Sequence, residues 1–142
     1  MNFDIKDLKI RSISSASTSE LEDILTLYKK EDWWEGNDSP KLILDIIKGS
    51  IIFVCAFFDN RIIGMGRAIG DGVSDAYIQD VAIVKEFRNK KIGSIIIENI
   101  ISQLKEKRIG WIGLISEKNS RDFYTKLGFS TMKGACPMKY KF

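Results

Sequence analysis

Basic side chains gather at the junction between an apolar segment and an amphipathic one, where they are suited to bind an anion. The junction consists of Arg88, Asn89, Lys90, Lys91, Ile92, Gly93 and Ser94. A helix beginning here would expose unpaired N–H groups and the positive end of its dipole beside the three basic residues. The glycine permits close backbone approach and the serine adds a hydroxyl donor, as in backbone nests that bind phosphate. The junction therefore predicts a diphosphate site, and a solvated turn without a ligand is the alternative.

The composition argues against several other kinds of chemistry. The chain contains no histidine, which removes Ser-His and Cys-His nucleophile pairs and histidine-ligated metals, so no metal site is expected. Its 22 basic and 19 acidic residues include no long Lys/Arg run, so nucleic acid is a poor candidate partner. Cys55 and Cys136 match neither a metal-binding nor a secreted disulfide pattern, which predicts a reducing, cytoplasmic setting. The apolar runs are too short for a membrane span, and no membrane association is expected.

The hydrophobic pattern indicates a single α/β domain over residues 1–142, because strand-like and helix-like segments alternate without a linker. Expected strands cover residues 8–14, 51–58, 76–84, 111–116 and a stretch from residue 62 onward. Expected helices begin near residues 19, 40, 92 and 120. Residues 129–142 have room for two final strands, which gives a mixed central sheet of about seven strands flanked by four helices. Asp59 and Asn60 predict a tight hairpin turn, and Ser19 with Glu22 predicts a helix capping box.

Two segments resemble motifs of the GNAT superfamily of N-acetyltransferases. The family's coenzyme A loop reads Arg/Gln-x-x-Gly-x-Gly/Ala between the fourth strand and the third helix, and Arg88 to Gly93 stands in that place with Lys91 at the first glycine. A family segment that begins with Asn and ends in Phe-Tyr-x-Lys-Leu-Gly-Phe, a helix followed by a strand, resembles residues 119–129, although packing alone would also explain their apolar members. With the order of elements, the resemblance covers residues 50–129 and implies a single-domain GNAT fold.

The GNAT resemblance implies acetyl-coenzyme A as co-substrate and a primary amine as acceptor. The pantetheine arm is expected to pair with the backbone of the fourth strand, which splays from the fifth. Besides residues 88–94, the expected coenzyme contacts are Val81, Ile83, Asn119, Phe123 and Lys126. Tyr124 matches the family tyrosine that acts as general acid toward the departing thiolate, with simple packing as the alternative. A backbone N–H near Val81 is the expected oxyanion donor.

The general base is the least constrained part of this site. Asp80 is the only carboxylate in the strand at residues 76–84, and it either deprotonates the amine or accepts hydrogen bonds from neighbouring loops. Ordered water is the third option, as in many family members. Strand alternation puts Tyr77, Gln79 and Val81 on one face and Asp80 on the other, unless a bulge intervenes.

The acceptor is expected to contact Tyr77, Gln79 and the connection between the first two helices. That connection contains acids and indoles, Glu31, Asp32, Trp33, Trp34 and Glu35. Carboxylates with indoles suit a cationic, partly apolar amine through charge and cation–π contacts. A hydrophobic lid is the alternative role for the two tryptophans.

Four alternatives remain open at the level of sequence. A small-molecule amine is the expected acceptor, with a protein N-terminus or lysine side chain as the alternative. A non-catalytic coenzyme A sensor would fit Lys91 at the glycine position, but Tyr124 argues against it. A nucleic-acid-binding module would need an extended basic face that the sequence lacks. Pairing of strands near the C-terminus into a homodimer, as in many family members, is also left open.

Overall fold

A sheet of five strands carries the candidate site. The computed structural model describes residues 2–34 and 39–142, and in these residues the strand order is β1-β2-β3-β4-β5. The strands are β1 (Lys9–Ser12), β2 (Ile52–Phe58), β3 (Arg61–Gly70), β4 (Asp75–Ile83) and β5 (Trp111–Gly113). The first four pair antiparallel, and β5 pairs parallel to β4, so the sheet is mixed as predicted.

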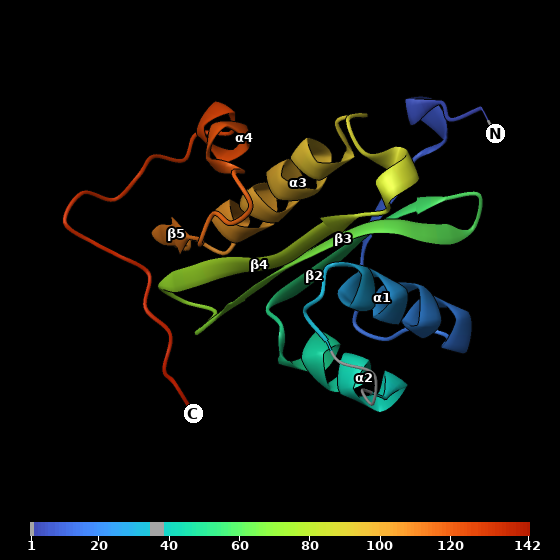
Figure 1. Cartoon of the computed structure of the whole chain (residues 1–142), viewed down its shortest axis with the longest axis horizontal. Helices are drawn as coiled ribbons and strands as arrows, with labels where there is room; N and C mark the ends of the chain where they lie inside the picture. Colours follow the sequence, from blue (N-terminus) through green and yellow to red (C-terminus); the bar gives the residue numbers. More distant parts are fainter. Residues whose placement is uncertain (1, 35–38) are drawn as a thin grey trace.

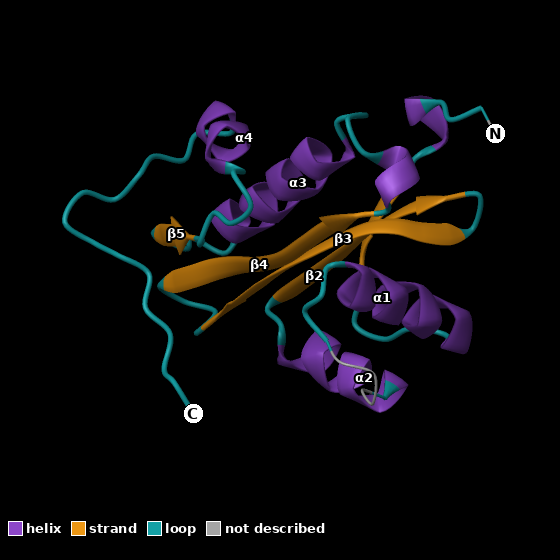
Figure 2. Cartoon of the chain, in the orientation of Figure 1, coloured by secondary structure: helices purple, strands orange, loops and turns teal. Residues whose placement is uncertain are grey.

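Helices cover both faces of this sheet (Figures 1 and 2). They are α1 (Thr18–Lys30), α2 (Pro40–Gly49), α3 (Ile92–Glu106) and α4 (Arg121–Lys126), with short 3₁₀ helices at Ile5–Asp7 and Lys85–Phe87. In Figure 1, α1 and α2 lie below the sheet, and α3 and α4 lie above it. The four predicted helices are thus present. In the described part of the chain, no helix combines the length and apolar character needed to cross a membrane.

Two apolar cores hold the layers together. Every residue of β2 is buried, because this strand lies inside the sheet with helices on both faces. Ile96 and Ile100 of α3 are fully buried in the upper core, and Ile24 of α1 and Ile43 of α2 are fully buried in the lower one. Burying a side chain of this size contributes roughly 1.5–3 kcal/mol. The sheet is therefore fixed from both sides, and β4 is positioned between α3 and α1.

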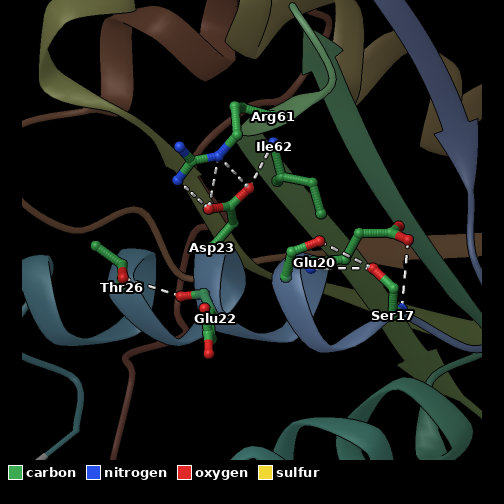
Figure 3. Close-up of polar contacts among 8 residues, drawn as sticks. Ser17, Glu20, Glu22, Asp23, Thr26, Arg61 and Ile62 are labelled. Carbon is green, nitrogen blue, oxygen red and sulfur yellow. Dashed lines mark hydrogen bonds and ion pairs between the residues drawn. The ribbon is translucent and has the colours of Figure 1, made fainter.

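The start of α1 is capped two residues earlier than the sequence predicted (Figure 3). Ser17 Oγ accepts a hydrogen bond from the backbone N–H of Glu20, whose carboxylate accepts one from the N–H of Ser17, so the capping box is Ser17–Glu20 rather than Ser19–Glu22. The Ser-x-x-Glu pattern occurs twice here, and the box forms where the backbone is still extended. One turn later, Asp23 pairs with the guanidinium of Arg61 and accepts from the N–H of Ile62.

The prediction of about seven strands was wrong, because residues 129–142 add none to the five-stranded sheet. This segment leaves the body of the protein after α4 and is exposed from Ser130 onward (Figure 1). Its alternation of apolar residues and lysines near the end resembles a strand. However, Pro137 has no N–H to donate, and strand geometry needs a partner that these residues do not contact. The segment also contains Cys136, an exposed free thiol.

The remaining predicted elements agree with the structure, apart from their ends. Asp59 and Asn60 adopt positive φ angles of 50° and 58° at the β2–β3 turn, as the hairpin prediction requires. The fifth strand ends at Gly113 rather than at Ser116. Its short length matters for the site, because it leaves most of β4 without a neighbour on that side.

Candidate active site

A β-bulge in β4 organises the site. Arg67 of β3 pairs with Gln79, and Met65 pairs with Ala82. Between these pairs, the single residue Gly66 on β3 lies opposite two residues on β4, Asp80 and Val81. Asp80 has a φ of 55°, which is the left-handed conformation that allows a bulge at a non-glycine residue. The bulge shifts the alternation of β4 by one residue.

This shift corrects the predicted faces of β4. Ile78 lies in the core beneath α3, Val81 and Ile83 pack against that same core, and Ala82 lies in the core beneath α1 and α2. Asp80 therefore shares the α1 face with Gln79, and Val81 does not, because one extra residue reverses the orientation of all that follow. The strand thus presents polar groups on one face and apolar groups on the other.

Asp80 is held by a network on the α1 side of the sheet. Its Oδ2 accepts hydrogen bonds from the Tyr28 hydroxyl and from Arg67 Nε, both at 2.7 Å. The side chains of Arg67 and Asp80 are only 15% and 22% exposed. Arg67 also reaches Gln79 Oε1 and Ser50 Oγ, each at 3.3 Å. Asp80 thus accepts hydrogen bonds, but its donors lie on helix α1 and strand β3 rather than on the neighbouring loops that the sequence suggested, and its Oδ1 has no partner among the described residues.

The two tryptophans of the α1–α2 connection pack over this network. Trp34 stacks on Tyr28 with ring centroids 4.5 Å apart, and Trp33 meets the same ring edge-on at 5.9 Å. Burial and the Asp80 carboxylate raise the pKa of Tyr28 far above its usual value, so its phenol keeps the proton that it donates. This packing agrees with the lid role for the tryptophans. Glu35, predicted with them, lies outside the described residues.

Tyr77 faces solvent beyond this network. Its ring is 46% exposed and lies 5.0 Å from that of Trp111 of β5. Tyr77 and Gln79 are both exposed; Tyr77 is the last residue of β4 that pairs with β5, and Gln79 lies just beyond this pairing.

The predicted coenzyme loop joins β4 to α3 through two left-handed residues. Asn89 and Lys91 have φ angles of 61° and 66°, so Lys91 adopts a left-handed conformation that glycine adopts more readily. The N–H groups of Ile92, Gly93 and Ser94 have no acceptor among the described residues, and Lys91 provides no side-chain cap. Four unpaired N–H groups are normal at a helix start and form an anion-binding end. The Ile92 side chain is in the core, so only its backbone faces the loop.

The edge of β4 next to this loop has no strand neighbour in the described residues. In the described residues, β5 pairs with β4 only at Asp75, Ala76 and Tyr77. Beyond these positions, the edge of β4 from residue 78 to residue 83 has no strand neighbour on the β5 side. Unpaired strand edges present N–H and C=O groups to whatever lies beside them. The gap that the GNAT resemblance predicted between the fourth and fifth strands is therefore present.

Helix α4 packs Phe123 against the start of α3. A Cβ atom on Gly93 would lie 3.3 Å from Cζ of Phe123, so the glycine permits this close approach. Tyr124 is half-buried beside Phe123 and Phe129, with ring centroids at 4.9 Å and 5.8 Å. Burial raises the pKa of Tyr124, so its phenol is neutral at physiological pH and can donate a proton. Asn119, at φ 61°, lies in the turn before this helix, and Lys126 is exposed on it.

The basic residues of the loop point in different directions. Lys90 Nζ lies 5.7 Å from the ring of Phe3, and Lys91 is exposed. Arg88 instead donates from Nε to the carbonyl of Ile83 at 3.1 Å and from Nη2 to Glu31 at 2.9 Å. The backbone N–H groups of the loop therefore lie together at the start of α3, whereas its three cationic side chains do not converge on one point.

Sequence reasoning missed three residues around the site, Tyr28, Arg67 and Lys118. Arg67 had a visible signal, because it is the only charged residue between Ile62 and Gly70 in an otherwise apolar strand. A buried charge needs a partner, and Asp80 is that partner. Tyr28 on the apolar face of α1 had a weaker signal of the same kind. Lys118, which pairs with Glu31, had none.

Comparison with known proteins agrees with this geometry. Residues 9–129 match the model of the Acetyltransferase (GNAT) family. The uncharacterized N-acetyltransferase ycf52 of Porphyra purpurea is 29% identical over 131 residues, which cover 89% of this chain and 74% of that protein. Two further relatives match half of the chain. A histone acetyltransferase of Glycine max is 36% identical over 30% of its own length, and a chloroplastic serotonin N-acetyltransferase of Oryza sativa is 31% identical over 35% of its own length.

A solved structure agrees over nearly the whole fold. The GNAT family acetyltransferase of Streptococcus pneumoniae TIGR4 superimposes with a TM-score of 0.79 at 22% identity, covering 95% of this chain and 98% of that one. At this identity the likeness establishes the fold, whereas the family match rests on the sequence over residues 9–129. The splayed strands, the loop before α3 and both comparisons agree, and the chain belongs to the GNAT family of acetyltransferases.

Proposed function

We propose that this chain transfers the acetyl group of acetyl-coenzyme A to a primary amine on a small molecule. The main support is the free edge of β4 beside an uncapped helix start. An extended amide arm can pair with the edge, and a diphosphate can accept from the N–H groups of Ile92, Gly93 and Ser94. Helix α4 packs Phe123 against Gly93 at this helix start, and Tyr124 is the next residue on α4, so we expect one ligand to reach all three features.

The described residues supply the groups that such a transfer needs. The amine nitrogen forms a bond to the acetyl carbonyl carbon, and the C–S bond breaks. A backbone N–H of β4 near Val81 stabilises the oxyanion between these events. Tyr124 gives its proton to the departing thiolate, and the proton lost by the amine passes to Asp80 Oδ1 or to water. The products are an acetamide and the free coenzyme thiol.

The acceptor side favours an amine with an apolar part. Trp33, Trp34 and Tyr77 lie on the face that also presents Asp80 and Gln79. A cationic amine is attracted by carboxylates and aromatic rings in this arrangement. The names of the relatives include both a serotonin and a histone acetyltransferase, so a lysine side chain is the second candidate acceptor.

Calorimetric titration with acetyl-coenzyme A tests the donor site first. Micromolar binding is expected for the wild type and for Tyr124→Phe, whereas Arg88→Ala should bind at least about tenfold more weakly, as for loss of one charge-assisted contact. Release of coenzyme thiol is then followed with aromatic amines, polyamines and a lysine peptide. Tyr124→Phe should slow turnover about 100-fold, the lower range for loss of a general acid. Absence of binding at every accessible concentration would reject the coenzyme site.

A further inference from the structure

A single carboxylate joins three segments that are far apart in the sequence. Glu31 follows the last turn of α1, and its Oε1 accepts from Arg88 Nη2 at 2.9 Å. Its Oε2 accepts from Lys118 Nζ, also at 2.9 Å, and its backbone carbonyl accepts from the same ammonium at 3.3 Å. Arg88 belongs to the coenzyme loop, and Lys118 belongs to the turn between β5 and α4. The pairs thus connect the end of α1, on the acceptor side, to the loop that follows β4 and to the turn that follows β5.

The position of Glu31 is unfavourable without these cations. The carboxylate is at the C-terminal end of α1, where the helix dipole is negative and repels an anion. Its side chain is only 13% exposed, so water compensates little of its charge. Arg88 and Lys118 therefore form a two-cation anion site, and Glu31 is the anion that occupies it in the free protein.

Arg88 covers two groups that the coenzyme is expected to contact. Its Nη2 is paired with Glu31, although the loop that contains Arg88 is the predicted diphosphate site. Its Nε satisfies the carbonyl of Ile83, which is one of the two β4 residues predicted to pair with the pantetheine arm. A ligand that contacts both the loop and this edge of β4 must therefore compete with contacts that Arg88 already makes.

We infer that Glu31 is an internal competitor of the coenzyme: the coenzyme diphosphate displaces the Glu31 carboxylate from Arg88 when it binds. This inference rests on the proposed coenzyme site. Lys118 keeps the second oxygen of Glu31, so the carboxylate rotates away from the loop without becoming unpaired. Glu31 is a positioning residue in this scheme, because it acts on the coenzyme through Arg88.

Displacement of Glu31 also links the donor side to the acceptor side. Lys118 Nζ lies 5.8 Å from the ring of Trp33, and Trp33 packs on Tyr28, which donates to Asp80. Movement of Glu31 would therefore shift Lys118, and through it Trp33 and Tyr28, which contact the proposed acceptor side.

Titration of coenzyme A into Glu31→Gln and Glu117→Gln tests this competition. Glu31→Gln removes the competing charge, so coenzyme A should bind about three- to tenfold more tightly, the size of one partly exposed ion pair. Glu117→Gln removes an exposed charge next to Lys118 without touching Arg88, and it should change the affinity less than about twofold. If Glu31→Gln does not fold, Glu31→Asp must tighten binding by a smaller factor, because its shorter chain weakens the contact with Arg88.

A double variant distinguishes competition from a general loss of negative charge. In an Arg88→Ala background, the tightening caused by Glu31→Gln should shrink to less than about twofold, because the contested group is absent. Unchanged or weaker coenzyme A binding in Glu31→Gln, with normal binding by the wild type, overturns the inference and leaves the proposed function intact. Equal tightening in Glu117→Gln overturns it as well. Failure of every form to bind coenzyme A rejects the proposed function and the inference together.

Discussion

Lys91 places a side chain where the family motif has glycine. At φ 66° and ψ 8°, it is a left-handed residue that begins α3 without a side-chain cap. The left-handed conformation costs an ordinary L-residue about 1–2 kcal/mol, because Cβ approaches the following carbonyl oxygen. The charge of Lys91 favours an anion nearby, so the chain accepts backbone strain at a position that suits the predicted ligand.

Lys91→Gly should raise the free energy of unfolding by about 1 kcal/mol, because glycine adopts this conformation without strain and its extra flexibility in the unfolded chain offsets part of the gain. Urea denaturation followed by circular dichroism measures the change. Lys90→Gly is the matched control, since Lys90 is not among the residues with positive φ, and it should leave stability equal or lower. Equal destabilisation by both substitutions would show that Lys91 is not strained.

Sequence reasoning identified the backbone of the donor site better than its side chains. The loop, the free strand edge and Tyr124 follow from motif and element order, because a helix start after a buried strand is fixed by local pattern. The partners of Asp80 and Arg88 could not be predicted in the same way. Tyr28 and Glu31 are more than 50 residues away from them, at separations of 52 and 57, and only tertiary packing makes them neighbours.

At the scale of elements, the periodic segments were predicted and the irregular ones were not. The four helices follow from apolar stripes, and the β2–β3 hairpin follows from its turn dipeptide. The bulge in β4 depends on the register with β3 and on how closely α3 approaches. A Cβ atom on Gly66, opposite the bulge, would lie 2.9 Å from Ile96. Periodicity within β4 alone does not locate the bulge, so the simple alternation fails after Gln79, and the alternative of a bulge is the one that the structure shows.

The cap of α1 gives a direct test at this scale. Ser17→Ala should lower the free energy of unfolding by about 1 kcal/mol, because the N–H of Glu20 loses its acceptor at the helix start. Ser19→Ala should cost a few tenths of that value, since Ser19 is already helical and contacts only the Ser17 hydroxyl at 3.2 Å. Urea denaturation of both variants compares them. A larger effect at Ser19 would favour the capping box that the sequence first indicated.

Across the whole molecule, the candidate site draws on both faces of the sheet. Tyr124 and the start of α3 lie on one side, and Asp80, Tyr28 and the tryptophans lie on the other. The two sides approach each other at the edge of β4 that lacks a strand neighbour, and the ion pairs of Glu31 with Arg88 and Lys118 also connect them. The proposed donor and acceptor would approach this edge from opposite faces of the sheet, which would bring their reacting atoms together there. The homodimer and the cytoplasmic setting stay predictions.

Folding stability of the molecule should decrease at high pH because of a buried thiol. Burial in the lower core raises the pKa of Cys55 from 9.0 to about 12. Above pH 9 the unfolded chain releases this proton and the folded protein keeps it, so the free energy of unfolding falls by about 1.4 kcal/mol per pH unit until pH 12. The buried phenol of Tyr28 adds to this loss above pH 10.0.

Denaturation between pH 8 and about pH 11 in wild type, Cys55→Ala and Cys136→Ser measures this dependence. Cys55→Ala should show a shallower decline above pH 9, whereas Cys136→Ser should match the wild type, because Cys136 is exposed and is not part of the core. If the free energy of unfolding fell equally with pH in all three proteins, folding would not hold the proton on the Cys55 thiol.

The difference between the two cysteines also affects how the enzyme is handled at the bench. Cys136 lies in the exposed segment after α4, and Cys55 is fully buried in β2. A chromogenic disulfide reagent will therefore react with one thiol per chain, that of Cys136, and this reaction adds to the colour produced by the released coenzyme thiol. A Cys136→Ser background removes that contribution. Conversely, a fluorophore attached to Cys136 in the unmodified sequence provides a single-site reporter of where the C-terminal segment goes in solution.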